Sequence, residues 1–179
     1  FAQDLEAQPG HPQTVAASLG SYNFASGYPS DVCIYDSGLA RTNRDGPSRS
    51  LTFDSSGECL FGNVSPATGY GLVRMWPTTH GFRTDTVGAF STIPGELSFG
   101  NGRLYGACGQ VVDPYAPAFI GSVSASGPQA IDTATGRAFY LAQSGAAWEL
   151  RAFDLATLQP TGTQTVANVR GTPASLIRC

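Results

Sequence analysis

Three aspartates at one point of a repeating pattern are the residues best placed to do chemistry. Asp36, Asp113 and Asp154 each end a short apolar segment and precede a turn. Carboxylates gathered on one face could hold Ca²⁺, which prefers hard oxygen ligands. In the alternative, each carboxylate accepts backbone N–H groups and shapes its own turn. A binding site is usually singular whereas these positions repeat, so the sequence favours turn formation and predicts no metal site.

The two histidines belong to no catalytic or metal-binding motif. His11 stands in the sequence PGHP and His80 in TTHG, so both are predicted to lie in exposed turns. A Ser-His-Asp triad needs a carboxylate that orients the histidine and an activated serine, and the chain has no GxSxG elbow. The histidine spacing also differs from HxH and HExxH. We therefore predict no catalytic residue and no cofactor, and the binding residues stay unassigned.

Two tryptophans offer the other candidate binding groups. Trp76 lies near Arg74, and Trp148 lies near Arg151. Such pairs could form a sugar platform or cation–π contacts, but large aromatic side chains more often fill the space between sheets, so packing is favoured. Asn63-Val-Ser also matches the acceptor pattern for N-glycosylation.

Four cysteines, at positions 33, 59, 108 and 179, form no CxxC and are too dispersed for a zinc knuckle. Cys33 and Cys59 are predicted to fall on strands of adjacent repeats, so a disulfide could bridge them. The alternative, in which both are small buried thiols, stays open.

An internal repeat must position all of these residues. Leu5, Leu51 and Leu97 occupy matching segments at intervals of 46 residues, and Gln129–Asp132 opens a further unit. A turn glycine follows each opening segment, and a glycine that can adopt positive φ between two short apolar runs is typical of a β-hairpin. These turn-forming glycines are Gly10, Gly57, Gly102 and Gly136.

Four strands per unit of about 40–50 residues are the signature of a propeller blade. A β-sandwich is the alternative, but it does not explain a recurrence at 46 residues. The sequence thus predicts an all-β fold: a β-propeller of four four-stranded antiparallel blades plus the first strand of a fifth, part of a larger ring. The predicted blades span residues 1–46, 47–92, 93–126 and 127–170, and the opening strand spans 171–179. The long loops 19–30 and 64–71 are expected to carry recognition surface.

Composition excludes two classes of partner. The formal net charge is −3, and the ten basic residues, all arginine, are scattered. Nucleic-acid binding needs a basic stripe, so no nucleic-acid partner is expected. No apolar run approaches the roughly 18 residues that cross a bilayer, so no membrane span is expected. Charged residues make up only 13%, which suits an exported β-protein.

Four runs of the chain resemble propeller regions of large bacterial surface proteins: DLEAQPGHPQTVAAS, ELSFGNGRLYGACGQVVDP, RAFDLATLQPTGT and GTPASLIRC. Those proteins join YVTN-type (YncE-like) propeller repeats to immunoglobulin-like repeats. The resemblance covers essentially the whole chain, although Cys179 stands where the family tends to have an aromatic residue. It implies export and a binding or structural role, and it carries no catalytic residue across.

The function expected from these observations is that of a non-catalytic, secreted or cell-surface module with a structural, adhesive or binding role toward a protein or glycan. Further blades or other chains should cover its open sheet faces. Two alternatives stay open. One is a propeller enzyme of lactonase or quinoprotein type, which would need convergent polar groups that are scarce here. The other is a subunit of a multi-protein extracellular assembly.

Overall fold

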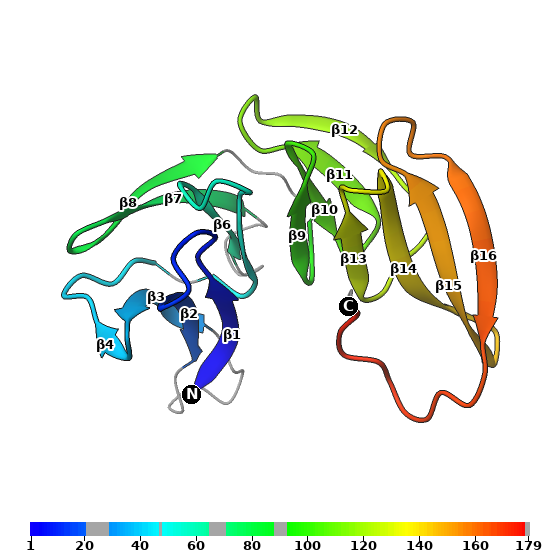
Figure 1. Ribbon diagram of the computed structural model, residues 1–179, viewed down its shortest axis with the longest axis horizontal. Helices are drawn as coiled ribbons and strands as arrows, with labels where there is room; N and C mark the ends of the chain where they lie inside the picture. The colour runs from blue at the N-terminus through cyan, green and yellow to red at the C-terminus, as the bar shows by residue number, and fades with distance from the viewer. Residues whose placement is uncertain (21–28, 47, 65–70, 88–92, 178–179) are drawn as a thin grey trace. The chain divides into compact units, whose positions relative to one another are not determined.

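Short β-branched and aromatic segments separated by glycine turns form sixteen strands in the computed structural model, which describes residues 1–20, 29–46, 48–64, 71–87 and 93–177. The strands make four four-stranded antiparallel sheets, in each of which every strand pairs with the next along the chain. Each sheet is one blade of a β-propeller, and no helix forms in the described residues (Figure 1). The predicted all-β propeller with four four-stranded blades is confirmed.

The four sheets follow one another in sequence. Sheet 1 contains β1 (Ala2–Ala7), β2 (Thr14–Gly20), β3 (Pro29–Asp36) and β4 (Leu39–Ala40). Sheet 2 contains β5 (Leu51–Phe53), β6 (Leu60–Val64), β7 (Gly71–Thr78) and β8 (Gly81–Val87). Sheet 3 contains β9 (Leu97–Gly100), β10 (Arg103–Gly106), β11 (Gln110–Asp113) and β12 (Ala118–Ser122). Sheet 4 contains β13 (Gln129–Asp132), β14 (Arg137–Ser144), β15 (Ala147–Asp154) and β16 (Pro160–Val166). Each sheet lies within one predicted blade range.

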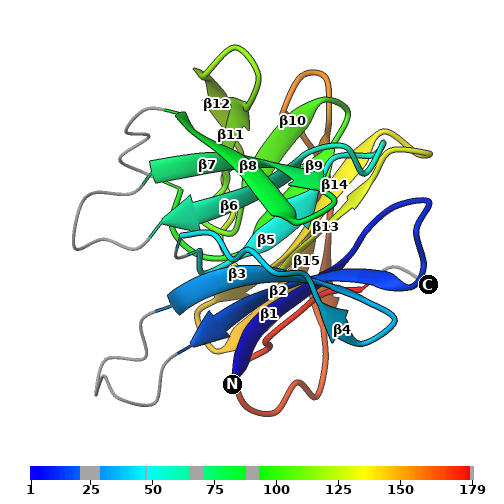
Figure 2. The same cartoon turned by 90° about the vertical axis from the view of Figure 1, so that its left-hand side faces the viewer.

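The chain divides into two compact units, Phe1–Leu97 and Ser98–Cys179. In the first unit, sheets 1 and 2 pack through apolar side chains that project from one face of each; both sheets are seen in Figure 2. Because successive side chains of a strand point to opposite faces, only alternate residues of β2 enter this core. Its buried members are Ala16, Val32, Leu51, Phe53, Leu60 and Met75.

In the second unit, sheets 3 and 4 share a core rich in aromatic residues. Tyr140 and Phe153 pack edge to face with ring centroids 5.9 Å apart, a favoured arrangement for aromatic pairs. The Tyr140 hydroxyl also donates a hydrogen bond to the Gly106 carbonyl at 3.3 Å. The buried members of this core are Tyr105, Val111, Val123, Ala138, Tyr140, Phe153 and Leu155.

The predicted opening strand and most of the predicted recognition loops are not seen in the described part of the chain. The opening strand expected over 171–179 is not formed in the described residues 171–177, because a strand requires a hydrogen-bonded neighbour and the ladder of sheet 4 is complete with β13–β16. Most of the predicted recognition loops, namely residues 21–28 and 65–70, lie outside the described residues. The described part of the chain has no helix with the length and hydrophobicity needed to cross a bilayer.

Candidate functional site

Two of the repeated aspartates shape the turns that follow their strands. Asp113 Oδ1 accepts backbone N–H groups from the second and third residues after it, at 2.8 and 2.9 Å. Asp154 Oδ1 does the same at 3.0 and 2.8 Å. The N–H of Thr157 is the main reason that the pKa of Asp154 lies below its ordinary value. These are Asx-turns, the structural alternative to a metal site.

The third aspartate binds an arginine. Asp36, at the end of β3, accepts Arg41 Nε at 2.7 Å and Nη2 at 3.0 Å, and the Thr14 hydroxyl at 2.8 Å. The Arg41 hydrogen bonds are the main cause that lowers the pKa of Asp36. Arg41 Nη1 also donates to the Thr78 carbonyl at 2.5 Å, which ties sheet 1 to sheet 2. Across the described ranges, no group of three or more His, Cys, Asp or Glu side chains gathers to hold a metal ion.

All four predicted turn glycines adopt left-handed backbone conformations. Gly10, Gly57, Gly102 and Gly136 have φ values of 76°, 75°, 72° and 67°. Glycine reaches this region without the steric cost that a Cβ atom brings. At Gly57 the space is also closed, because a Cβ atom there would lie 2.6 Å from a backbone carbonyl oxygen.

The possible disulfide between Cys33 and Cys59 is not formed, and both are buried thiols. Strand alternation gives the reason. Val32 enters the core between sheets 1 and 2, so its neighbour Cys33 on β3 projects away from that core. Cys59 was predicted on a strand but directly precedes β6. Burial is the main cause that raises the pKa of Cys59 to about 12, which leaves its reactive thiolate form scarce.

The two histidines lie in different exposed turns, His11 between β1 and β2 and His80 between β7 and β8. The backbone carbonyl of His80 accepts Asn43 N–H at 2.6 Å and the Thr42 hydroxyl at 3.3 Å. Both of these hydrogen bonds involve the main chain of His80, and they fasten the segment after β4.

Trp76 is half-buried on β7 and lies within cation–π range of two arginines. The Arg83 guanidinium carbon is 4.6 Å from the ring centroid, and that of Arg74 is 5.5 Å from it. Arg74 also pairs with Asp85 at 2.6 Å. Arg74 therefore makes one of the cation–π contacts that the sequence allowed, and the two guanidinium groups leave less of the Trp76 ring accessible to a sugar.

Trp148 and Arg151 lie on opposite faces of β15, because they are an odd number of residues apart. Arg151 turns instead to Glu149, at 2.8 and 3.0 Å, and to the Ser124 carbonyl at 3.0 Å. Trp148 is half-buried, opposite Val166 in the ladder.

Asn63 is a buried link that sequence reasoning missed. Its side chain is 5% exposed, and its Oδ1 accepts Ser50 N–H at 2.9 Å. Its Nδ2 donates to the carbonyls of Gly95 at 2.6 Å and Ile93 at 3.4 Å. Asn63 therefore holds the segment that leads into β9, and the side-chain amide to which a glycan would be attached is buried in the folded chain.

A second missed feature joins the first strands of successive sheets. Asp4 Oδ2 accepts Leu51 N–H at 2.7 Å, and Ser50 Oγ accepts Leu97 N–H at 2.9 Å. Both acceptors directly precede a repeating leucine, so the same contact recurs one repeat later. The signal that could have revealed it is this polar residue before each leucine.

Three carboxyl groups near these strands have raised pKa values. Burial is the main cause for Asp4, Glu6 and Glu96, and the negative charge of Asp4 adds to it for the other two. Backbone N–H groups oppose the shift, as where Phe53 N–H donates to Glu6 Oε1 at 3.4 Å. Desolvation wins at each position, so these groups resist ionisation more than exposed carboxyl groups do.

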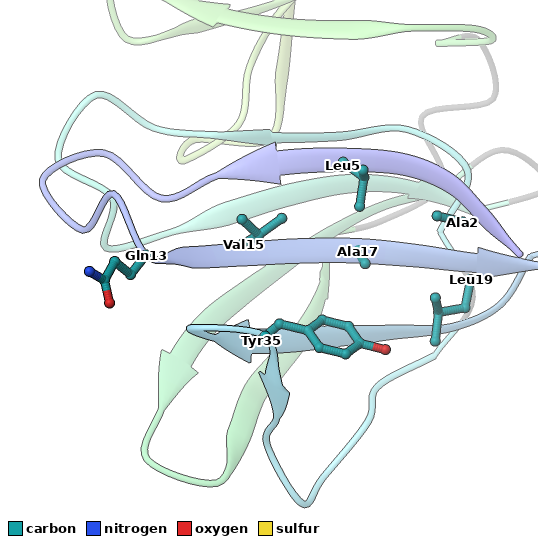
Figure 3. A pocket seen from close by; sticks show the side chains of 8 residues that line it. Ala2, Leu5, Gln13, Val15, Ala17, Leu19 and Tyr35 are labelled. Atoms are coloured by element: carbon teal, nitrogen blue, oxygen red, sulfur yellow. The ribbon is translucent and has the colours of Figure 1, made fainter.

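An apolar groove of about 340 Å³ lies on sheet 1. It lies on the face turned away from sheet 2, because Ala16 enters the core with sheet 2 while its neighbours on β2 point the other way. Figure 3 shows side chains from β1, β2 and β3 along it. We call this feature the first-sheet groove, and its lining includes Leu5, Gln13, Val15, Ala17, Leu19 and Tyr35.

Comparisons with known proteins identify the fold and no family. No protein-family model matches the chain. No curated protein sequence matches it either. Among solved structures, it is similar to Kuenenia stuttgartiensis hydrazine synthase, with a TM-score of 0.62 and 13% identity over 92% of this chain and 49% of that one. It is also similar to Citrobacter koseri AztD, with a TM-score of 0.55 and 16% identity over 87% of this chain and 44% of that one.

A further similar structure is the WD40 domain of Toxoplasma gondii coronin, with a TM-score of 0.51 and 12% identity over 89% of this chain and 57% of that one. At such low identities the likeness concerns the fold alone. The chain spans about half the length of the first of these structures.

Proposed function

We propose that this chain is a non-catalytic propeller module, exported to the cell surface, in which the first-sheet groove docks a protein surface. The observation that carries the proposal is the exposed apolar face of sheet 1, where Leu5 is 60% exposed. Contiguous apolar surface beside a hollow is typical of interaction sites.

The chemistry of the groove favours a protein over a glycan. Its walls are mostly aliphatic, with Val15 and Leu19 from β2 and the ring of Tyr35 from β3. A glycan site needs convergent polar groups that satisfy sugar hydroxyls. Trp76, which the sequence offered as a ring for sugar stacking, is on another sheet and lies against two guanidinium groups.

Several acidic side chains support a non-catalytic role because they are used in structure. Asp113 and Asp154 hold turns, Asp36 holds Arg41, and Asp4 holds the first strand of sheet 2. A catalytic acid or base must instead reach a bound substrate. Export is supported by the low charged fraction and by the resemblance to YVTN-type (YncE-like) surface propellers.

The first test compares the groove in the isolated chain with the groove in the polypeptide as the cell makes it. The native polypeptide is purified together with whatever binds to it. Hydroxyl-radical footprinting should then label Leu5 and Tyr35 less in this sample than in the isolated chain. Val15→Glu should restore their labelling, whereas Thr84→Glu, at an exposed position of β8, should not. Equal labelling of isolated and native forms would refute binding at the groove.

Export and the lack of catalysis are tested separately. Protease treatment of intact cells should release peptides of this chain, and exclusive recovery from the cell interior would refute export. Lactone hydrolysis by the purified protein, abolished by one Asp→Asn substitution, would refute the non-catalytic role.

A further inference from the structure

The first-sheet groove repeats, position by position, a surface that is buried elsewhere in the first unit. Leu5 lies opposite Ala17 in the ladder of sheet 1, as Leu51 lies opposite Gly62 in sheet 2. The two leucines are one repeat of 46 residues apart. Leu51 is buried against sheet 1, whereas Leu5 is 60% exposed.

The agreement continues on the next two strands. Val15 of β2 lies opposite Tyr35 of β3, as Leu60 of β6 lies opposite Met75 of β7. Leu60 and Met75 are 0% and 1% exposed because sheet 1 covers this face of sheet 2. The groove is therefore the same face of the repeat without its covering sheet.

A backbone group gives independent support. Leu51 N–H donates to Asp4 Oδ2 of the preceding sheet, and Leu97 N–H donates to Ser50 Oγ in the same way. The equivalent N–H of Leu5 donates to the adjacent Asp4 Oδ1 at 2.9 Å and is solvent-exposed. At two repeats the preceding sheet thus supplies the acceptor for this N–H, whereas at the first repeat the acceptor is local.

The sizes of the matched side chains define what must cover the groove. Sheet 2 presents Phe53 and Leu60 to the small Ala16 of sheet 1. The corresponding residues of sheet 1 are Ala7 and Val15, which are smaller. Close packing requires complementary volumes, so the covering surface must carry bulkier side chains than sheet 1 offers to sheet 2.

From these matches we propose that the first-sheet groove is a blade-docking face, and that the protein surface docked there is a further four-stranded β-blade of the same polypeptide. This rests on the proposed function and names its partner. The blade presents bulky apolar side chains to Ala7 and Val15. Its first strand carries Asp or Ser where Asp4 and Ser50 stand, and that side chain accepts Leu5 N–H.

The lengths of similar solved structures favour this source over a separate protein. The chain covers 49% and 44% of two such structures, whose chains therefore contain about as much again. Additional blades in one polypeptide also avoid the entropy cost of associating two molecules.

The test places a photo-cross-linker in the groove of the polypeptide as the cell makes it. Leu5→p-benzoylphenylalanine should cross-link within one polypeptide, so the mass on denaturing gels stays that of a single chain. Peptide mapping should locate the partner in a segment outside residues 1–179 with a glycine hairpin and an Asp-Leu or Ser-Leu pair on its first strand. Leu39→p-benzoylphenylalanine is the matched control, because Leu39 is 77% exposed on the same sheet but lies opposite Asp36, on the other face.

Each outcome decides the question. An intramolecular cross-link from position 5 to a segment outside residues 1–179, lost on Val15→Glu and absent from position 39, supports the further blade. An intramolecular cross-link that maps within residues 1–179 overturns it. A doubled mass would mean that a second copy fills the groove, and a cross-link to a different protein would mean that a separate partner fills it. Either result would overturn the proposal of a further blade in the same polypeptide but would still support the groove as a docking site for a protein surface. If position 5 forms no cross-link and remains accessible to footprinting reagents, the proposed function is overturned as well.

Discussion

The Asn63 link offers a quantitative test of how the first unit is held together. Asn63→Ala removes the acceptor of Ser50 N–H and the donor to the carbonyls of Gly95 and Ile93. A buried group left without its partner costs about 1–3 kcal/mol, and an ordinary hydrogen bond contributes about 0.5–1.5 kcal/mol net. Ser50 and Ile93 are buried whereas Gly95 is exposed and can bind water. We therefore expect the free energy of unfolding to fall by about 2–4 kcal/mol.

The assay must follow the first unit alone. In a Trp148→Phe background the remaining tryptophan, Trp76, reports on that unit, and urea unfolding is followed by its fluorescence. Asn63→Asp should cost at least as much as Asn63→Ala near neutral pH, because a carboxylate cannot donate to the two carbonyls, and should recover in part when acid protonates it. Thr84→Ala, at an exposed strand position, should change stability by no more than about 0.5 kcal/mol. A loss below about 1 kcal/mol for Asn63→Ala would refute the role assigned to this side chain.

Four other outcomes follow from the same structure. Burial raises the pKa of Glu6 above its ordinary value, so the folded state holds the Glu6 proton more tightly than the unfolded state does. The stability that this protonated carboxyl contributes is full at low pH and is lost as pH rises through the folded pKa. Glu6→Gln should therefore reduce the difference between urea midpoints measured at about pH 4 and about pH 7. Cys59, with a pKa of about 12, should react with a thiol reagent in the native protein roughly tenfold or more slowly than in urea, and fast native labelling would contradict its burial. Gly57→Ala should lower the thermal midpoint more than Gly10→Ala, because both need positive φ but only at Gly57 would the Cβ atom meet a backbone oxygen. Secretion from a eukaryotic host should leave Asn63 without a glycan, as intact mass would show, if folding precedes modification.

Much of the fold was predictable because it is written in local signals that repeat. The recurrence of Leu5, Leu51 and Leu97 at 46 residues and the turn glycines after them identified the blades. Each hairpin depends on a glycine with positive φ and on short apolar strands, which are properties of neighbouring residues. The role of Asp113 and Asp154 was predictable for the same reason, since an Asx-turn is formed within a few residues.

The question that the sequence left open and the prediction that failed both concerned contacts between elements. The sequence allowed either a disulfide or two buried thiols at Cys33 and Cys59, because the face that each thiol occupies depends on register and on which residues enter the core between the sheets. The expected strand over 171–179 also depends on a partner strand, and its own residues cannot provide one. Strand propensity is a local property, whereas strand formation is not.

The sequence by itself determined the repeat, the four-bladed all-β fold and the turns, because these arise from residues close together in the chain. Only the tertiary structure decided that Asn63 holds the entry to β9, that Asp4 and Ser50 join successive first strands, and that Leu5 is exposed where Leu51 is buried. The physical reason is that burial belongs to a pair of sheets. The same side chain in the same register is core or surface according to whether a neighbouring sheet covers it.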